Sequence, residues 1–351
     1  MAIYFMLTKI SVSILEKTVT VNGFGRFLKS RDPELRSGSF RFSERRKMRQ
    51  PVIDMLDIGG GLKMRYGIWP FPGSECRGSV LLLNGRAEFL EKHLETVCDL
   101  LERGFDVYSL DWRGQGLSTR MLENPHKGHV ASFEDYIHDL ELFVRTVMAE
   151  ATRPRTILAH SMGAHIALRF IREHDGFANR AVLVSAMCDI HTFPLPGVLA
   201  RRIVKWAAHS GRKDRYLPGD GDYRKKLYFA NPYTSDPVRF QDEHRAIVQN
   251  PALALGGPTC GWAAAAFDSI DQLEFSGFAE AVYTPILMIA GRRDRVVRFD
   301  ALKAISRRLP LSRLMVLKGA RHEILKETDA VRKRFWELFD RFCGEGMSYE
   351  G

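Results

Sequence analysis

The strongest constraint on the fold is an alternation of short β-branched or aliphatic runs with longer amphipathic segments, from about residue 63 to residue 342. This alternation is typical of a parallel sheet with helices on both faces. The expected strands are 63–68, 79–83, 106–110, 156–159, 181–185, 285–290 and 313–317. The expected helices are 88–102, 133–149, 162–173, 300–308 and 328–342. Their order predicts an α/β fold with a mostly parallel, doubly wound sheet.

One long stretch interrupts this alternation. About 100 residues between the expected strands 181–185 and 285–290 are rich in Pro, Gly and aromatic residues and contain no clear strand. A loop of that length in a compact domain usually carries function, so we predict a helical cap inserted at about 188–280. The apolar content of 45% suits one large core, which we expect to span 51–345.

The segment 156–163, with the sequence T-I-L-A-H-S-M-G, predicts a strand, a tight turn and a helix. In the nucleophile elbow G-x-S-x-G, small residues flank the serine because the turn is sharp. Here Ala159 replaces the first Gly, and Gly163 keeps the second. A relaxed match of this kind also arises by chance, and an ordinary helix N-cap is the alternative interpretation of Ser161. Its position directly between strand and helix favours the nucleophile.

A nucleophilic serine needs a base that takes its proton, so the elbow predicts an Asp and then a His at later strand ends. Asp294 follows the strand 285–290 through a glycine turn, and His322 follows the strand 313–317. Taken alone, the acid would be a solvated loop residue and the histidine a surface residue. The order and the three strand ends together predict a catalytic triad, with Ser161 as nucleophile, His322 as general base and Asp294 as the orienting acid.

Such a triad also needs backbone N–H groups that point at the negative charge of the tetrahedral intermediate. We expect one from Met162, which follows the nucleophile. We expect the other from Arg86, in the turn after the strand 79–83. Gly85 would allow that backbone to approach closely.

Six segments carry a resemblance to a known family: 84–88 (N-G-R-A-E), 111–116 (D-W-R-G-Q-G) with Ser118, 128–130 (G-H-V) with Phe133, Asp135 and Tyr136, 159–163, 231–236 (N-P-Y-T-S-D) and 319–323 (G-A-R-H-E). Over about residues 60–342 the chain resembles the bacterial lysophospholipase and monoacylglycerol lipase family of α/β-hydrolases. Members usually carry H-G-x-x-E and G-H-S-x-G, so Asn84 and Ala159 are departures. Neither departure removes a triad atom or a backbone donor.

The resemblance implies an α/β-hydrolase fold with a helical cap. It also implies hydrolysis of a carboxylic ester of a lipid, a lysophospholipid or a monoacylglycerol, through an acyl-enzyme. An esterase or amidase that acts on another small molecule uses the same triad and stays an alternative. A catalytically silent binding protein on this fold is the alternative from outside the enzymes.

The predicted cap supplies candidates for substrate binding. Phe193, Trp206, Tyr233 and Trp262 are expected to line an acyl-chain pocket, although most apolar cap residues simply pack the cap. Residues 188–226 contain nine Lys or Arg and four acids. A solvated helix face explains any one of these charges. As a group they raise the hypothesis of peripheral contact with an anionic membrane or headgroup.

Neither nucleic acid nor a metal or cofactor is expected. The net charge is +10, but the first 50 residues hold eleven Lys or Arg against four acids, so the rest of the chain is nearly balanced. Nucleic-acid binding would need a basic stripe with interleaved aromatic residues. His129, His160 and His165 lack a second ligand pair at metal spacing, so they are expected to be structural. The triad chemistry requires no cofactor.

Two features bear on where the protein acts. Five scattered cysteines without close pairs indicate reduced thiols and a cytoplasmic location, peripheral to the membrane if the cap contacts it. The polar, basic composition of residues 1–50 predicts a disordered extension. No apolar stretch approaches the roughly 20 residues of a membrane-spanning helix.

Overall fold

An eight-stranded sheet forms the centre of the computed structural model, which describes residues 49–192 and 194–344. The strands are β1 (Val52–Asp57), β2 (Lys63–Trp69), β3 (Gly78–Leu83), β4 (Phe105–Leu110), β5 (Arg155–His160), β6 (Arg180–Val184), β7 (Ile286–Gly291) and β8 (Ser312–Leu317). Their order in the sheet is β1-β2-β4-β3-β5-β6-β7-β8. β1 pairs antiparallel with β2, and β2 pairs antiparallel with β4, whereas the other neighbours pair in parallel. The α/β fold with a mostly parallel sheet is therefore confirmed.

All seven expected strands are present, and each of their ends lies within one residue of the expected position. The sequence did not indicate β1, which lies at the edge of the sheet and pairs only with β2. Its residues V-I-D-M-L-D include two acids, and none of the six is fully buried. An edge strand with one neighbour lacks the continuous apolar run that marks a strand covered on both faces.

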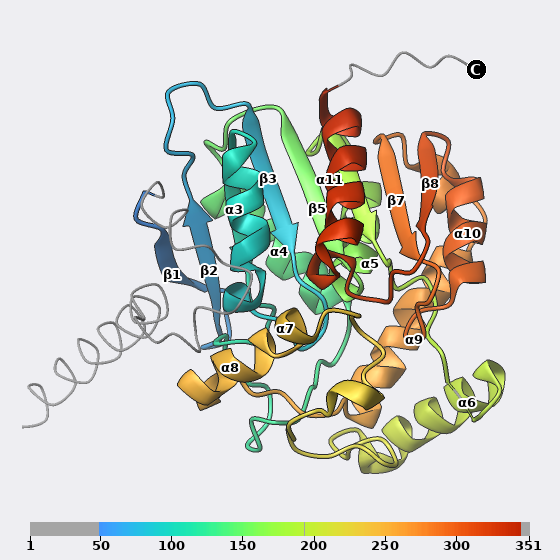
Figure 1. Ribbon diagram of the computed structural model, residues 1–351. Coiled ribbons are helices and arrows are strands. Elements are labelled where there is room, and N and C mark those ends of the chain that lie inside the picture. The colour runs from blue at the N-terminus through green and yellow to red at the C-terminus, as the bar shows by residue number, and fades with distance from the viewer. Residues whose placement is uncertain (1–48, 193, 345–351) are drawn as a thin grey trace, which may run out of the picture.

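Helices cover both faces of the sheet (Figure 1). They are α3 (Leu94–Glu102), α4 (Glu134–Val147), α5 (Met162–Glu173), α6 (Gly197–Ala207), α7 (Pro237–Phe240), α8 (Asp242–Gln249), α9 (Cys260–Glu274), α10 (Phe299–Arg308) and α11 (Asp329–Gly344). Successive side chains of a strand point to opposite faces. Thus Leu81 and Leu83 of β3 pack in the cluster with α4, α5 and α9, whereas Val80 and Leu82 pack with α3 and α11.

The long interruption between β6 and β7 folds as helices, as expected, and its described residues contain no strand. Its elements α6 to α9 lie at the carboxyl ends of the parallel strands, the lower side in Figure 1. We call residues 188–280 the cap. α9 is part of the main core, since Phe267 and Ile270 are buried with the sheet residues. Short turns complete the fold: η2 (Leu90–His93), η3 (Ala208–Arg212), η4 (Tyr228–Ala230), η5 (Pro251–Leu253), η6 (Ala279–Ala281) and η7 (Ile324–Lys326).

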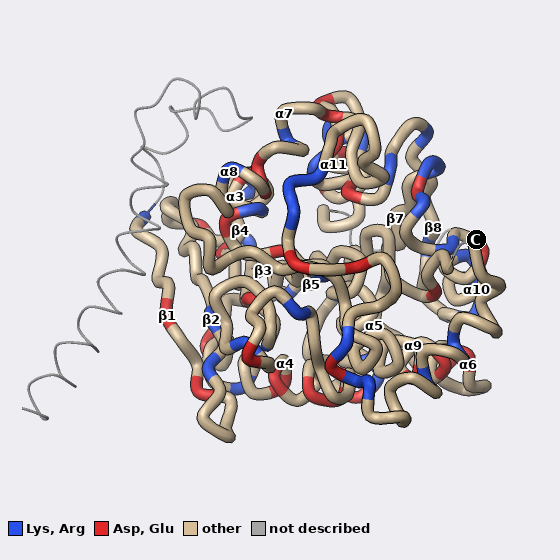
Figure 2. Tube along the Cα trace, turned by 90° about the horizontal axis from the view of Figure 1, so that it is seen from below, with Lys and Arg blue, Asp and Glu red and all other residues tan. Residues whose placement is uncertain are grey.

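Charges of both signs alternate along the described chain, as Figure 2 shows from the cap side. Within the described residues, no helix is long and apolar enough to cross a membrane. All five cysteines are free. The predicted N-terminal extension, up to residue 48, lies outside the described residues, as does Phe193.

Candidate active site

Ser161 is the single residue between β5, which ends at His160, and α5, which begins at Met162. Its backbone has φ 53° and ψ −114°, a conformation that residues with a side chain rarely adopt. Such strain persists only where the surroundings impose it, and it is concentrated at functional sites. Here the Ser161 N–H donates to the Val184 carbonyl at 2.9 Å, and the Met187 N–H donates to the Ser161 carbonyl at 3.1 Å. Both bonds fix the turn to β6 and its exit loop.

The small residues around Ser161 have a steric cause. A Cβ at Gly163 would lie 2.5 Å from the Asn84 carbonyl oxygen and 2.6 Å from that of Leu83, so α5 starts in contact with the end of β3. Ala159, the departure from the family pattern, is fully buried in β5 and pairs with Leu83. The sheet therefore accommodates one methyl group before the nucleophile, whereas the helix start accommodates none after it.

The structure brings Ser161, His322 and Asp294 into one hydrogen-bonded chain. The Nε2 atom of His322 lies 2.9 Å from Ser161 Oγ, and its Nδ1 atom lies 2.8 Å from Asp294 Oδ2. The other carboxylate oxygen of Asp294 accepts hydrogen bonds from the N–H groups of Val296 and Val297 at 2.8 and 3.1 Å. Burial alone would raise the pKa of Asp294, but the bonds from His322 and the two amides outweigh it and lower the pKa. The acid is therefore ionised and oriented at neutral pH.

The loop that carries His322 is fixed through its backbone. The His322 carbonyl accepts a hydrogen bond from Ser185 Oγ at 2.8 Å, and His160 Nε2 lies 3.2 Å from the same oxygen. Ser185 also has a positive φ of 47°. The side chain of His160, the residue before the nucleophile, thus supports the residue that carries the base. This agrees with a structural role for His160.

The turn after β3 contains the second predicted oxyanion donor, Arg86. Asn84 anchors this turn, because its Nδ2 donates to the Leu110 carbonyl at 2.9 Å and its carbonyl accepts from Trp112 Nε1 at 2.8 Å. The Ala87 N–H donates to the side chain of Gln115, and the Gly85 N–H donates to Glu88. Asn84 therefore fills the family's usual His position without loss of the turn's support.

The two predicted oxyanion amides have no hydrogen-bond acceptor among the described residues. Within residues 49–192 and 194–344, neither the Arg86 nor the Met162 N–H donates to a protein acceptor. The Arg86 side chain points away from the turn, since its Nη2 donates to the Gly256 carbonyl in the cap at 2.7 Å and its guanidinium lies 5.3 Å from the Trp262 ring. The Arg86 side chain thus binds the cap rather than the oxyanion turn.

A buried ion cluster that the sequence analysis missed joins the oxyanion turn, the base loop and the cap. Lys92 Nζ lies 2.8 Å from Glu323, 3.1 Å from Glu243 of α8 and 3.3 Å from Glu88. Burial alone would lower the pKa of Lys92, but the three carboxylates raise it well above its usual value. Likewise, burial would raise the pKa of Glu88, but His160 and Lys92 lower it. The i,i+4 spacing of Glu88 and Lys92 was the available signal.

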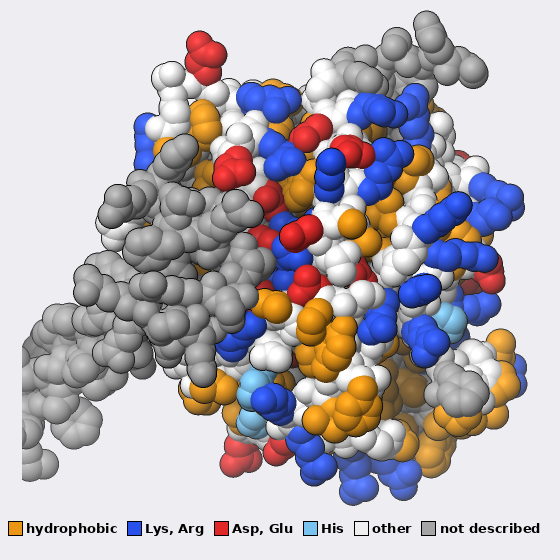
Figure 3. Space-filling view, viewed as in Figure 1, with side chains coloured by type: hydrophobic (Ala, Val, Ile, Leu, Met, Phe, Trp, Pro, Cys, Tyr) orange, Lys and Arg blue, Asp and Glu red, His pale blue; other side chains and the backbone are white. Residues whose placement is uncertain are grey.

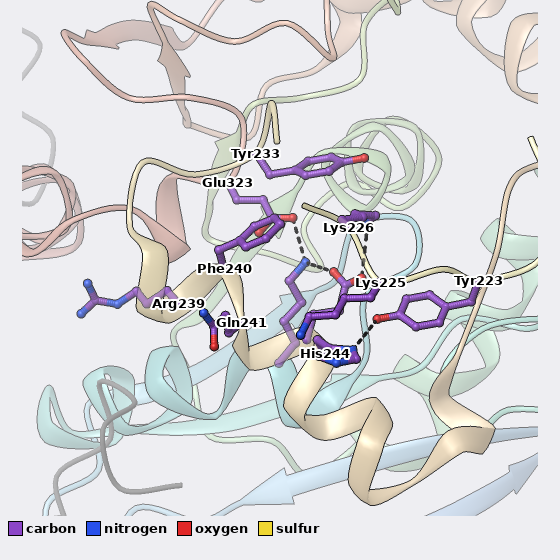
Figure 4. Close-up of a pocket in the computed structure, with 11 residues that line it drawn as sticks. Tyr223, Lys225, Lys226, Tyr233, Arg239, Phe240, Gln241, His244 and Glu323 are labelled. Atoms are coloured by element: carbon purple, nitrogen blue, oxygen red, sulfur yellow. Dashed lines mark hydrogen bonds and ion pairs between the residues drawn. The ribbon is translucent and has the colours of Figure 1, made fainter. Parts of the chain in front are cut away.

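A small cavity lies beside this cluster (Figure 4). Glu323, Lys226 and Tyr233 line it together with residues of α7 and α8, and its volume is about 30 Å³. Lys226 Nζ lies 3.4 Å from Glu243 and 4.6 Å from the ring centre of Tyr233. The cavity has room for water but not for an acyl chain.

The predicted substrate-binding residues lie in different places. Trp262 is buried on α9, next to Arg86 and 5.7 Å from the ring of Phe133. Tyr233 is half-buried, and its carbonyl accepts a hydrogen bond from the Glu323 N–H at 2.8 Å. Trp206 lies on the outer side of α6 with 60% of its surface exposed. The structure thus places Trp262 against the Arg86 side chain and Tyr233 at the base loop, and it leaves Trp206 at the surface.

The remaining two histidines bind the cap to the core. His165 of α5 is buried, with Nε2 2.6 Å from Ser269 Oγ of α9 and Nδ1 3.0 Å from the Met187 carbonyl. Burial lowers the pKa of His165 to about 3, so the ring is neutral. His129 Nδ1 lies 2.8 Å from Thr259 Oγ1, at the start of α9. Both positions agree with structural roles.

Comparison with known proteins gives consistent results. A family model described as serine aminopeptidase, S33 matches residues 74–329. Lysophospholipase L2 of Escherichia coli is 37% identical over 262 residues, which cover 72% of this chain and 76% of that protein. Monoacylglycerol lipase of Mycolicibacterium smegmatis is 24% identical over 77% of this chain and 89% of its own length. A crystal structure of a soluble variant of Saccharomyces cerevisiae monoglyceride lipase superposes with a TM-score of 0.66 at 20% identity, over 84% of this chain and 96% of that one.

Proposed function

This chain belongs to the serine aminopeptidase S33 family, and we propose that it is a serine hydrolase that cleaves the carboxylic ester of a lysophospholipid or a monoacylglycerol. The observation that carries the proposal is the hydrogen-bonded chain from Ser161 through His322 to Asp294, on a strained turn between strand and helix. Lysophospholipase L2, which is 37% identical, supports a lysophospholipid as substrate. The monoacylglycerol lipase supports a monoacylglycerol as the alternative substrate.

In the proposed mechanism, Ser161 Oγ attacks the ester carbonyl carbon while its proton passes to His322 Nε2. Asp294 accepts the Nδ1–H bond and thereby fixes the tautomer of the base. The N–H groups of Arg86 and Met162 stabilise the oxyanion. Collapse of the intermediate breaks the ester bond, and the leaving alcohol takes the proton from His322. Water then attacks the acyl-enzyme with the same base, which releases the fatty acid and restores Ser161.

The cap supports a lipid substrate. Trp262 lies against the Arg86 side chain and Tyr233 at the base loop, where they would contact an acyl ester. Phe193 is proposed to line the same pocket, whereas the exposed Trp206 would contact lipid at the surface of α6. The outer side of α6 exposes Val198, Leu199 and Ile203 beside Trp206, and apolar side chains cover this part of the surface in Figure 3. A helix with one exposed apolar face is typical of peripheral membrane contact. We therefore propose a cytoplasmic protein that acts at a membrane surface.

Active-site labelling tests the nucleophile. A fluorophosphonate probe should label the wild-type chain covalently, and the Ser161→Ala variant should be neither labelled nor active. Ser306→Ala is the control, because Ser306 is another buried serine but bonds Ser312 at the start of β8, away from the triad, so this variant should still be labelled. Equal labelling of wild type and Ser161→Ala would reject Ser161 as the nucleophile.

A substrate panel tests the class of reaction. Lysophosphatidylcholine, monoolein, a short-chain p-nitrophenyl ester and an aminoacyl p-nitroanilide should separate lipid esterase, general esterase and aminopeptidase activities. We expect the two lipids to have the highest kcat/KM. A preference for the anilide would overturn the ester proposal, and labelling without turnover of any substrate would favour a binding protein.

A further inference from the structure

A cleft rich in arginine lies on the outer side of the triad acid. Its volume is about 610 Å³. One wall consists of cap residues and the other of the loops that follow β7 and β8. The lining residues are Phe229, Ala230, Asn231, Pro232, Arg292, Arg293, Asp294, Arg295 and Arg321. We call this the arginine cleft. In Figure 3, Lys and Arg side chains gather on this part of the surface, between the lower ends of β7 and β8 and α6.

The charges in the arginine cleft are not balanced by the protein. Four arginines line the cleft with a single carboxylate, Asp294, which already binds His322 and two backbone amides. Among the described residues, none of Arg292, Arg293, Arg295 and Arg321 forms an ion pair. Arg298 in the same loop is different, because its Nη1 lies 3.0 Å from Asp189. Asp189 thus neutralises an arginine of this loop, but it lies outside the cleft.

Hydrogen bonds fix the backbone that carries Arg292 and Arg293 and the side chain of Arg321. The Arg292 N–H donates to the Leu317 carbonyl at 3.1 Å, and the Arg293 N–H donates to the Ala320 carbonyl at 2.9 Å. Arg321 Nη1 donates to the carbonyls of Asn231 and Thr234 at 2.9 and 3.1 Å, which joins the two walls. Like charges held close together repel each other, and a bound anion removes that repulsion.

We propose that the arginine cleft binds a phosphate group. Guanidinium is planar and matches two phosphate oxygens at once, so several arginines around one cavity favour phosphate over a simple carboxylate. The volume leaves room for a glycerol phosphate rather than the ion alone. The adjoining side chain of Phe229 is 86% exposed, and Leu227 and Tyr228 are exposed beside it. Apolar side chains next to a phosphate site suit the headgroup of a phospholipid, while free phosphate has the same chemistry.

Titration with inorganic phosphate, followed by isothermal calorimetry, tests the proposal on the full chain. The double variant Arg292→Gln/Arg295→Gln should bind phosphate at least about tenfold more weakly than wild type, since each lost charge-assisted hydrogen bond is worth about tenfold or more. Arg307→Gln is the matched control, because this exposed arginine lies in the last turn of α10, at the end of the helix away from the cleft loop. The single variant Arg293→Gln repeats the test with less change to the loop. Equal affinities for wild type and both cleft variants would overturn the proposal.

Vesicle sedimentation separates the two sources of phosphate. Digalactosyldiacylglycerol vesicles carry no phosphate, and addition of phosphatidylglycerol supplies it. If wild type sediments only with vesicles that contain phosphatidylglycerol, and the double variant does not, the ligand is a lipid headgroup. Binding of inorganic phosphate without any change in retention would support a soluble phosphate ester. Both measurements use the Ser161→Ala chain in parallel, so they do not depend on ester turnover and can succeed even if the proposed function fails.

Discussion

Replacement of Lys92 by methionine should greatly lower the free energy of unfolding of this chain. Lys92 is only 4% exposed, and its ammonium group is the shared partner of Glu88, Glu243 and Glu323 at 2.8 to 3.3 Å. Methionine keeps the length of the side chain but removes the cation that the three carboxylates share. Loss of one partner from a buried ion pair costs about 3–5 kcal/mol. That is a large share of the roughly 5–15 kcal/mol that stabilises a typical protein.

The pH dependence of this loss identifies its cause. In the wild type, burial would raise the pKa of Glu243, but Lys226 and Lys92 lower it to about 2. Its stabilisation is therefore present above about pH 4.5, the ordinary pKa, and is lost as the pH falls towards 2. In Lys92→Met the carboxylates that have lost Lys92 take up protons more readily, and protonation removes the cost of their buried charge in acid. The stability gap between the two proteins should narrow as the pH falls below about 4.5.

Urea unfolding at pH 7.5 and at pH 4 measures both effects. The control is Lys303→Met on the exposed side of α10, which should change stability by less than about 0.5 kcal/mol. A loss below about 1 kcal/mol for Lys92→Met, or a gap that is the same at both pH values, would refute the role of the ion cluster. The variant should also lose activity, because Glu88 holds the oxyanion turn and Glu323 follows the base.

Three further predictions concern the elbow, the acid and the core. Gly163→Ala should reduce turnover at least tenfold and cost about 1–3 kcal/mol, because its Cβ would collide with the Asn84 carbonyl at 2.5 Å; wild-type kinetics would contradict this. Asp294→Asn should lower kcat about 10⁴-fold while KM changes little. A variant that kept more than about a tenth of the activity would mean that another acid orients His322. Burial would raise the pKa of Glu95, but hydrogen bonds from Arg239 help lower it to about 2. The stability advantage of wild type over Glu95→Gln should therefore be complete above about pH 4.5 and disappear in stronger acid, as thermal melts can measure.

The parallel strands and the triad could be predicted because both depend on local patterns. Buried strands such as β5 and β7 are continuous apolar runs, and the triad side chains each follow such a run. β1 could not be predicted, since its residues are partly exposed and its pairing with β2 depends on the finished sheet. The cap helices were expected as a group, but α6 exposes four large apolar residues, so periodicity does not indicate which side faces the core.

The ion cluster and the arginine cleft could not be predicted because they join distant parts of the sequence. Lys92 and Glu323 are 231 positions apart, and nothing in either local sequence indicates the other. The arginines near Asp294 were visible in the sequence, but their lack of acidic partners depends on how the cap loop at 229–232 folds against them. Trp206 was selected for its residue type, and only the fold shows that it is exposed.

The two ends of the cap are attached in different ways, and this matters for engineering. α8 reaches the catalytic loops through buried ions, with Glu243 at Lys92 and Asp242 at Lys326. α6 is tied mainly to α9, through partly exposed pairs such as Lys205 with Asp268. Exchange of residues 197–212 between relatives should therefore transplant surface properties and leave the chemistry intact. Exchange of residues 237–249 would instead import foreign charges into the catalytic centre, and only chimeras that bring their own matching partners would stay active.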